Sequence, residues 1–204
     1  MIDWIGQNGG AVQAAAAVLT AFVWLIYLHI LVSGLRRSRR SEILITLAGR
    51  RDRSGRILIS NLGFEPIYVL DVLLRGVTNE DERIVSVAEL TDREGTSPDS
   101  LKAATLQTPL KSGEVMDAGQ IEDLIGRAAR HQSLDTCRDS HRGLEITVAA
   151  VTAATSNIVA ARREFRVQEA ENGEITVRPV RLYAEQVRRR GQRKKIERLL
   201  VEAL

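Results

Sequence analysis

Three residues in the second half of the chain carry the side chains best suited to hold a metal ion. His131, Cys137 and His141 lie within eleven residues, with Asp135 and Asp139 between them, and zinc is commonly bound by imidazole and thiolate. Strong zinc signatures contain two ligand pairs, whereas this stretch offers a single Cys-x-x-x-His. Cys137 and His141 also have the types of a nucleophile and a base, but no orienting or oxyanion motif accompanies them. We therefore interpret the segment as a polar loop and keep the three residues as weak zinc candidates.

No other segment has the spacing of a catalytic site. Glu80, Asp81 and Glu82 form a run of three carboxylates beside an expected strand, and a solvated hairpin tip accounts for such a run. The sequence contains no glycine-rich phosphate loop, no Gly-x-Ser-x-Gly, no His-Glu-x-x-His and no dinucleotide-binding fingerprint. We expect a protein that is not an enzyme and that uses no cofactor.

The first part of the chain predicts a transmembrane helix over residues 11–33. Between positions 11 and 32 only Gln13, Thr20 and His29 are not apolar, and about 20 helical residues suffice to cross a hydrocarbon core of roughly 30 Å. A cleaved signal peptide requires a basic start, whereas the first ten residues carry Asp3 and neither Lys nor Arg. The helix is therefore expected to remain as an anchor.

The charges that flank this helix predict its orientation. A basic collar at residues 34–41 contains Arg36, Arg37, Arg39 and Arg40. Lys and Arg are retained on the cytoplasmic side of a membrane, so we expect residues 1–10 outside and all residues after the helix in the cytoplasm.

Residues 42–182 have the pattern of an antiparallel β-domain. Short runs rich in aliphatic and β-branched residues are separated by Gly, Asn, Asp and Ser, and Asn172-Gly173 is a strong hairpin signal. We predict a mainly β protein, a sandwich of seven or eight strands, with one short surface helix over 118–131 that starts after Asp117. Arg163 falls on an apolar strand face, where its stem is expected to snorkel to the rim.

The run Leu58-Ile59-Ser60-Asn61-Leu62-Gly63, followed by Glu65-Pro66-Ile67-Tyr68-Val69, resembles the second-to-third strand region of immunoglobulin-like and fibronectin-like modules. The whole layout is similar to uncharacterised bacterial single-pass membrane proteins that carry such a module. The resemblance implies an immunoglobulin-like β-sandwich. This sequence lacks the Cys-Trp-Cys core of immunoglobulin domains, because Cys137 is the single cysteine. The resemblance implies no active-site residue. Such sandwiches serve adhesion, scaffolding and sensing alike.

The last segment, residues 183–204, predicts a basic amphipathic helix that Gly191 kinks or divides. Its lipid or partner contacts are expected from seven basic residues: Arg188, Arg189, Arg190, Arg193, Lys194, Lys195 and Arg198. The leucines of this helix can dock on the sandwich, or the helix can contact anionic lipid. It can also bind an acidic partner. Nucleic acid is disfavoured because few aromatic residues remain outside the anchor to stack on bases.

The net charge of +3 hides an uneven distribution. Residues 36–56 carry eight arginines and two carboxylates, residues 65–145 carry nine basic and sixteen acidic groups, and residues 146–204 carry twelve and seven. The leading hypothesis is a membrane-anchored interaction or assembly module at the cytoplasmic face of a bacterial inner membrane. Its expected partners are the lipid bilayer and another membrane or cytoplasmic protein, or a second copy. The alternative is a sensor of anionic lipid or of an acidic partner that acts through the C-terminal helix.

Overall fold

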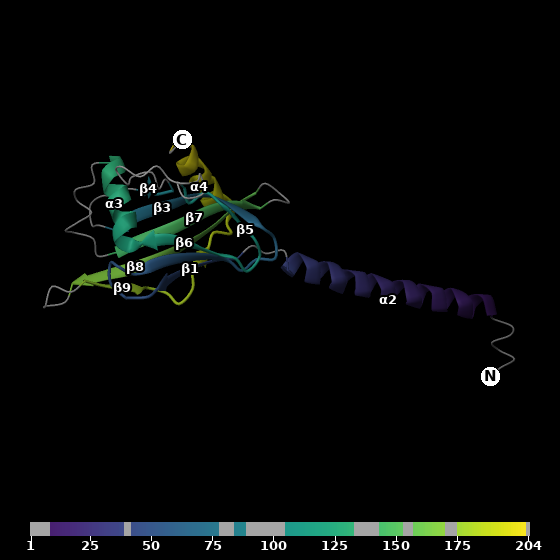
Figure 1. Cartoon of the computed structure of the whole chain (residues 1–204). Coiled ribbons are helices and arrows are strands. Elements are labelled where there is room, and N and C mark those ends of the chain that lie inside the picture. Colours follow the sequence, from purple (N-terminus) through teal and green to yellow (C-terminus); the bar gives the residue numbers. More distant parts are fainter. Residues whose placement is uncertain are drawn as a thin grey trace. The chain divides into compact units, whose positions relative to one another are not determined.

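The computed structural model describes residues 9–38, 42–77, 84–88, 105–132, 143–152, 157–169 and 175–202. The chain divides into two compact units, residues 1–40 and residues 41–204. Figure 1 shows the elements of both units.

The first unit contains α2 (Gly9–Ser38). Its stretch Gly10–Gly34 is long and apolar enough to cross a membrane, and none of its most apolar window is buried. Large side chains project all around the helix; Phe22, Trp24 and Leu25 are each at least 60% exposed. A helix at the surface of a soluble domain buries one apolar stripe, so an apolar helix without such a stripe is typical of a membrane segment.

The second unit is built from two antiparallel sheets, so the predicted mainly β, antiparallel character is confirmed. The smaller sheet consists of β1 (Ile43–Ala48), β2 (Arg56–Asn61) and β6 (Val115–Gln120) in the order β1-β2-β6. The centre of the larger sheet consists of β8 (Ile158–Glu169), β7 (Gly143–Thr152) and β3 (Ile67–Val77).

Shorter strands extend both sides of the larger sheet. β4 (Ile84–Ser86) and β5 (Pro109–Leu110) pair with β3, while β9 (Ile175–Pro179) and β10 (Glu185–Gln186) pair with β8. Seven of the strands in the described residues have five residues or more. Six of these lie in runs whose pattern predicts strands, whereas β6 includes residues 118–120, where the surface helix was expected to begin. The remaining three have only two or three residues. β4 and β5 lie within longer runs that predict strands, whereas β10 lies in the segment expected to be helical.

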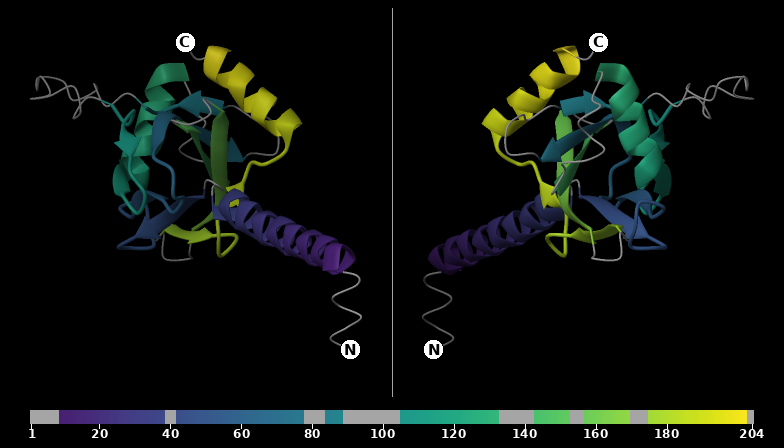
Figure 2. Two further views of the ribbon diagram at one scale, coloured as in Figure 1. Left: turned by 90° about the vertical axis from the view of Figure 1, so that its right-hand side faces the viewer. Right: turned by 90° about the vertical axis from the view of Figure 1, so that its left-hand side faces the viewer.

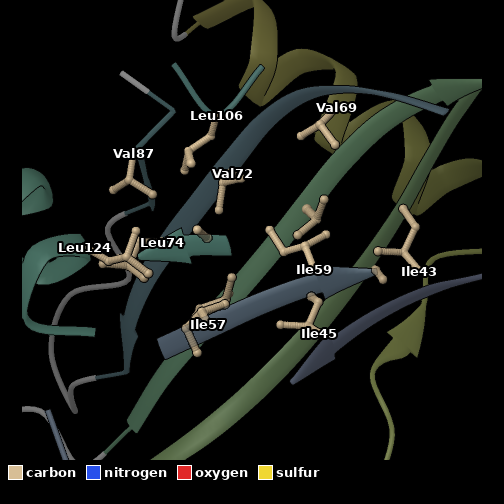
Figure 3. Packing of buried hydrophobic residues seen from close by; sticks show 14 of the residues in the cluster. Ile43, Ile45, Ile57, Ile59, Val69, Val72, Leu74, Val87, Leu106 and Leu124 are labelled. Carbon is tan, nitrogen blue, oxygen red and sulfur yellow. The ribbon is translucent and has the colours of Figure 1, made fainter. Parts of the chain in front are cut away.

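The core lies between the two sheets, where their apolar faces meet. Ile43, Ile45, Ile57 and Ile59 of the smaller sheet point toward the larger sheet, which contributes Val69, Val72 and Leu74 from β3 (Figure 3). All four isoleucines are at most 1% exposed, and each fully buried side chain of this kind contributes about 1.5–3 kcal/mol. In β1 and β2 the core isoleucines occupy every second position, which directs them to the same face of the smaller sheet.

The surface helix α3 (Ile121–Gln132) begins three residues later than expected. Asp117 does not cap it: this residue lies in β6, and its carboxylate accepts a hydrogen bond from the Arg56 guanidinium at 2.6 Å. The first helical amides instead bond to the β1–β2 connection, Ile121 N to Gly55 O and Glu122 N to Arg53 O, both at 3.0 Å. These carbonyls are 66 or more positions away in sequence, so the capping signal is not local.

The C-terminal helix α4 (Arg190–Glu202) also begins later than the expected residue 183. Glu185 and Gln186 pair with β8 as β10, which holds the preceding segment in extended conformation. Gly191 therefore lies in the first turn of one continuous helix and does not divide it.

Candidate contact surface on the C-terminal helix

α4 docks on the outer face of the larger sheet, opposite the main core (Figure 2). Ile196 is 8% exposed and forms a second apolar cluster with Ala149, Ala160 and Val187. Ile158 of β8 and Leu200 of α4 pack against this cluster. The arrangement expected when the helix docks its apolar residues on the sandwich is the one found in the structure.

Small side chains on the outer face of the larger sheet leave room for this helix to pack closely. Ala149 of β7 and Ala160 of β8 are direct cross-strand partners, and they project from the outer face because their neighbours Ala150 and Ala161 belong to the main core. Since a methyl group projects little from a sheet, a helix can approach closely enough for Ile196 to fill the space above the pair.

The segment before α4 is attached to both sheets. Val187 N donates to Ala160 O at 2.7 Å, and the Gln186 side chain donates to Ile43 O at 2.7 Å and accepts from Ile43 N at 3.2 Å. The Arg162 guanidinium donates to the Glu185 carboxylate at 2.8 Å. This hydrogen bond holds the pKa of Glu185 below its ordinary value. The start of the helix is therefore fixed by contacts on three successive residues.

One of the seven predicted contact residues serves the fold of the helix. Arg193 is half-buried, and its Nε donates to Val187 O at 3.2 Å. Its backbone amide bonds to Arg189 O at 3.1 Å in the first helical turn. Arg193 thus stabilises the junction between β10 and α4, and we do not count it among the residues that present charge to solvent.

The other six basic residues are exposed and form no ion pair within the described part of the chain. They are Arg188, Arg189, Arg190, Lys194, Lys195 and Arg198. Arg190, Lys194 and Arg198 follow one another at intervals of four residues, which places them along one face of a helix. Ile196 and Leu200 lie on the opposite face at 100° per residue, so docking leaves the basic row directed to solvent.

Arg163 is a buried cation, whereas the sequence predicts that its side chain reaches the rim of the sheet. The side chain does not snorkel: it is 7% exposed, and its guanidinium donates to Ile45 O of β1 and to Leu182 O at 3.0 Å. It also lies 5.6 Å from the centre of the Phe165 ring. Burial lowers the pKa of Arg163. The residue joins β8 of the larger sheet to β1 of the smaller one, and its position on an apolar face was the only signal.

The weak zinc candidates are mostly outside the described residues. His131 belongs to the end of α3, its side chain is not described, and Cys137 and His141 lie outside the described ranges, as do Glu80, Asp81 and Glu82. Within those ranges no group of three or more His, Cys, Asp or Glu side chains is placed to hold a metal ion.

The structure describes two of the four arginines that predict the orientation of the transmembrane helix. Arg36 and Arg37 belong to the last turns of α2, whereas Arg39 and Arg40 lie outside the described residues. The expected collar thus begins within the helix itself.

Comparisons of the chain with protein-family models, curated proteins and solved structures found no match. The function is therefore inferred from the anchor, the sheets and the surface of α4.

Proposed function

We propose that this chain is a single-pass membrane protein that holds an immunoglobulin-like sandwich at the cytoplasmic face of a bacterial inner membrane. It acts as an interaction module without catalysis, and it binds an acidic surface of a partner protein through α4. The observation that carries this proposal is the docked helix, which fixes a row of exposed basic side chains by burying its opposite face.

The anchor supports the membrane part of the proposal. α2 contains an apolar stretch of 25 residues, Gly10–Gly34, which is long enough to cross a membrane. The arginines at positions 36, 37, 39 and 40 follow it, against Asp3 before it, and this asymmetry favours a cytoplasmic domain.

The sheet arrangement supports an immunoglobulin-like sandwich. Two antiparallel sheets enclose one core, and the residues that face it recur at every second position in strands of both sheets, such as β1 and β7. Seven longer strands on two facing sheets are typical of such modules, whose surfaces commonly serve binding.

Docking of α4 lowers the conformational entropy that the basic row loses when it binds a partner. A flexible basic tail must lose side-chain and backbone entropy when it binds, whereas α4 is already ordered on the sheet. Its exposed charges, Arg190, Lys194 and Arg198, are held at the spacing of successive helical turns. Attraction between such a row and an acidic surface is weakened by salt over a Debye length of about 8 Å at physiological ionic strength.

Charge reversal tests this function directly. The variant R190E/K194E/R198E leaves Ile196 and the docked face unchanged, and R166E/R178E reverses two exposed arginines that are cross-strand partners on β8 and β9. Crosslinking of the full chain in intact membranes is expected to yield an adduct with an acidic protein. The first variant should lose this adduct and the second should keep it; an adduct that persists in the first variant contradicts the proposal.

A second candidate function is binding of α4 to anionic lipid, because the same basic row suits the anionic cytoplasmic leaflet at roughly 1 kcal/mol per Lys or Arg held at the surface. Hydrogen exchange of α4 in nanodiscs separates the two. Greater protection in discs with phosphatidylglycerol than in neutral discs, lost in the α4 variant, supports lipid binding; equal protection in both discs contradicts it.

A further inference from the structure

The connection between β2 and β3 is a turn fixed by one buried side chain. Asn61 is fully buried, and its Nδ2 donates to Glu65 O at 2.9 Å and to Leu110 O at 3.1 Å. Its Oδ1 accepts a hydrogen bond from Gly63 N at 3.0 Å. All the hydrogen-bonding capacity of the amide nitrogen and one acceptor are thus used to hold the turn in a single conformation.

This turn presents two large apolar side chains to solvent. Phe64 is 75% exposed and Leu62 is 53% exposed, whereas Gly63 between them is buried. Of the large hydrophobic residues in the described part of the chain, Phe64 is the most exposed. A rigid turn that exposes a Phe and a Leu together indicates a contact surface for an apolar environment.

The turn lies beside the residue at which the chain enters the β-domain. Leu62 N donates to Glu42 O at 2.8 Å, and Asn61 is the cross-strand partner of Ile43. We call this end of the domain, formed by Glu42 and residues 61–66, the proximal end.

The covalent chain limits how far the proximal end can be from a membrane that α2 spans. Three residues separate Ser38 from Glu42, and four extended residues reach at most about 14 Å. The helix residues between Gly34 and Ser38 add roughly 6 Å at 1.5 Å per residue. The headgroup layer itself occupies about 5–8 Å on each side of the hydrocarbon core, so the proximal end must stay within a short distance of lipid headgroups.

The groups around the turn are of mixed charge. Lys111 is exposed on the β5–β6 connection, which bonds to Asn61 through Gly113 N at 2.7 Å. The carboxylates nearby are those of Glu42, Glu65 and Glu114. Four arginines at 36, 37, 39 and 40 precede them in the chain. Because charges of both signs lie near the turn, attraction of the turn to lipid would come from its exposed apolar side chains and not from a net charge.

We propose that Phe64 and Leu62 insert into the boundary between headgroups and acyl chains of the bilayer that α2 spans. The inference rests on the proposed membrane anchor. Amphipathic and aromatic groups are favoured at this boundary, and the Asn61 amide holds the backbone of the turn that carries both side chains. The insertion gives the domain a second attachment to the membrane and so a fixed orientation.

Single-tryptophan variants of the full chain test this contact. The background W4F/W24F keeps the anchor apolar, and F64W then places the fluorophore on the turn. The matched control is Q168W, at an exposed position of β8. Ile158, at the start of β8, is in register through Val151 with Tyr68 at the start of β3, next to the turn. Gln168 is ten residues from Ile158, or about 33 Å along the strand. Both proteins are reconstituted in vesicles of phosphatidylethanolamine and phosphatidylglycerol, with or without bromine on the acyl chains.

The expected result is blue-shifted emission and loss of fluorescence with brominated lipid for F64W, and neither for Q168W. If the protein resists alkaline extraction but position 64 behaves like position 168, the inference is overturned while the anchor stands. If alkaline extraction removes the protein from the vesicles, the anchor fails, and the inference fails with it. Equal quenching at both positions also overturns the inference, because the contact would then not be specific to the turn.

Discussion

Truncation of Ile196 is expected to release α4 from the sheet without unfolding the domain. Ile196 is 8% exposed, and it fills the space above the Ala149–Ala160 pair. Replacement of a buried Ile by Ala costs 2–5 kcal/mol in protein cores. Because this cluster is small and lies near the surface, we expect about 2 kcal/mol, which reduces the docked population relative to the free one by up to about 30-fold.

The assay is amide hydrogen exchange of the full chain in nanodiscs. I196A should accelerate exchange in α4, while β7 and β8 keep their protection because their hydrogen bonds do not involve the helix. The control is V201A, at a position of the same helix that is 65% exposed, and it should change little. Unchanged exchange of α4 in I196A, or equal acceleration in both variants, refutes the docking argument.

Three further results are expected. R163M should lower the free energy of unfolding by about 1–3 kcal/mol in chemical denaturation, because the carbonyl of Ile45 loses its buried donor. N61A should destabilise the domain by a similar amount, about 1–3 kcal/mol, and increase exchange in the β2–β3 turn, because three hydrogen bonds are lost. Acidification should loosen β10 in exchange measurements: the Arg162 hydrogen bond lowers the pKa of Glu185, so its stabilisation is present above the ordinary carboxylate range and is lost as pH falls through the lowered pKa. The variant E185Q should remove this pH dependence.

Six of the seven longer strands could be predicted from the sequence because their patterns are local. In β7 the core residues Leu144, Ile146, Val148 and Ala150 alternate with residues on the other face, and this period of two is visible without any partner strand. The end of β6, the two-residue β10 and the start of α3 could not be predicted in this way. They depend on carbonyls such as Gly55 O and on neighbours that only the folded chain brings together.

The docking of α4 is a long-range property of the chain. The basic and apolar residues of the helix are visible in the sequence. The residues on which Ile196 packs, Ala149 and Ala160, lie at least 36 positions earlier. Nothing local distinguishes an apolar helix face that packs on a sheet from one that packs on lipid. The buried state of Arg163 is similar, because the carbonyl that accepts its hydrogen bond belongs to Ile45, 118 positions away.

Protease accessibility in spheroplasts tests the central claim of a membrane-anchored domain in the cytoplasm most directly. Protease added to intact spheroplasts should leave a C-terminally tagged chain undigested in the β-domain, and lysis should make the same domain available to cleavage. Digestion of the domain in intact spheroplasts would contradict the orientation predicted from the arginine collar.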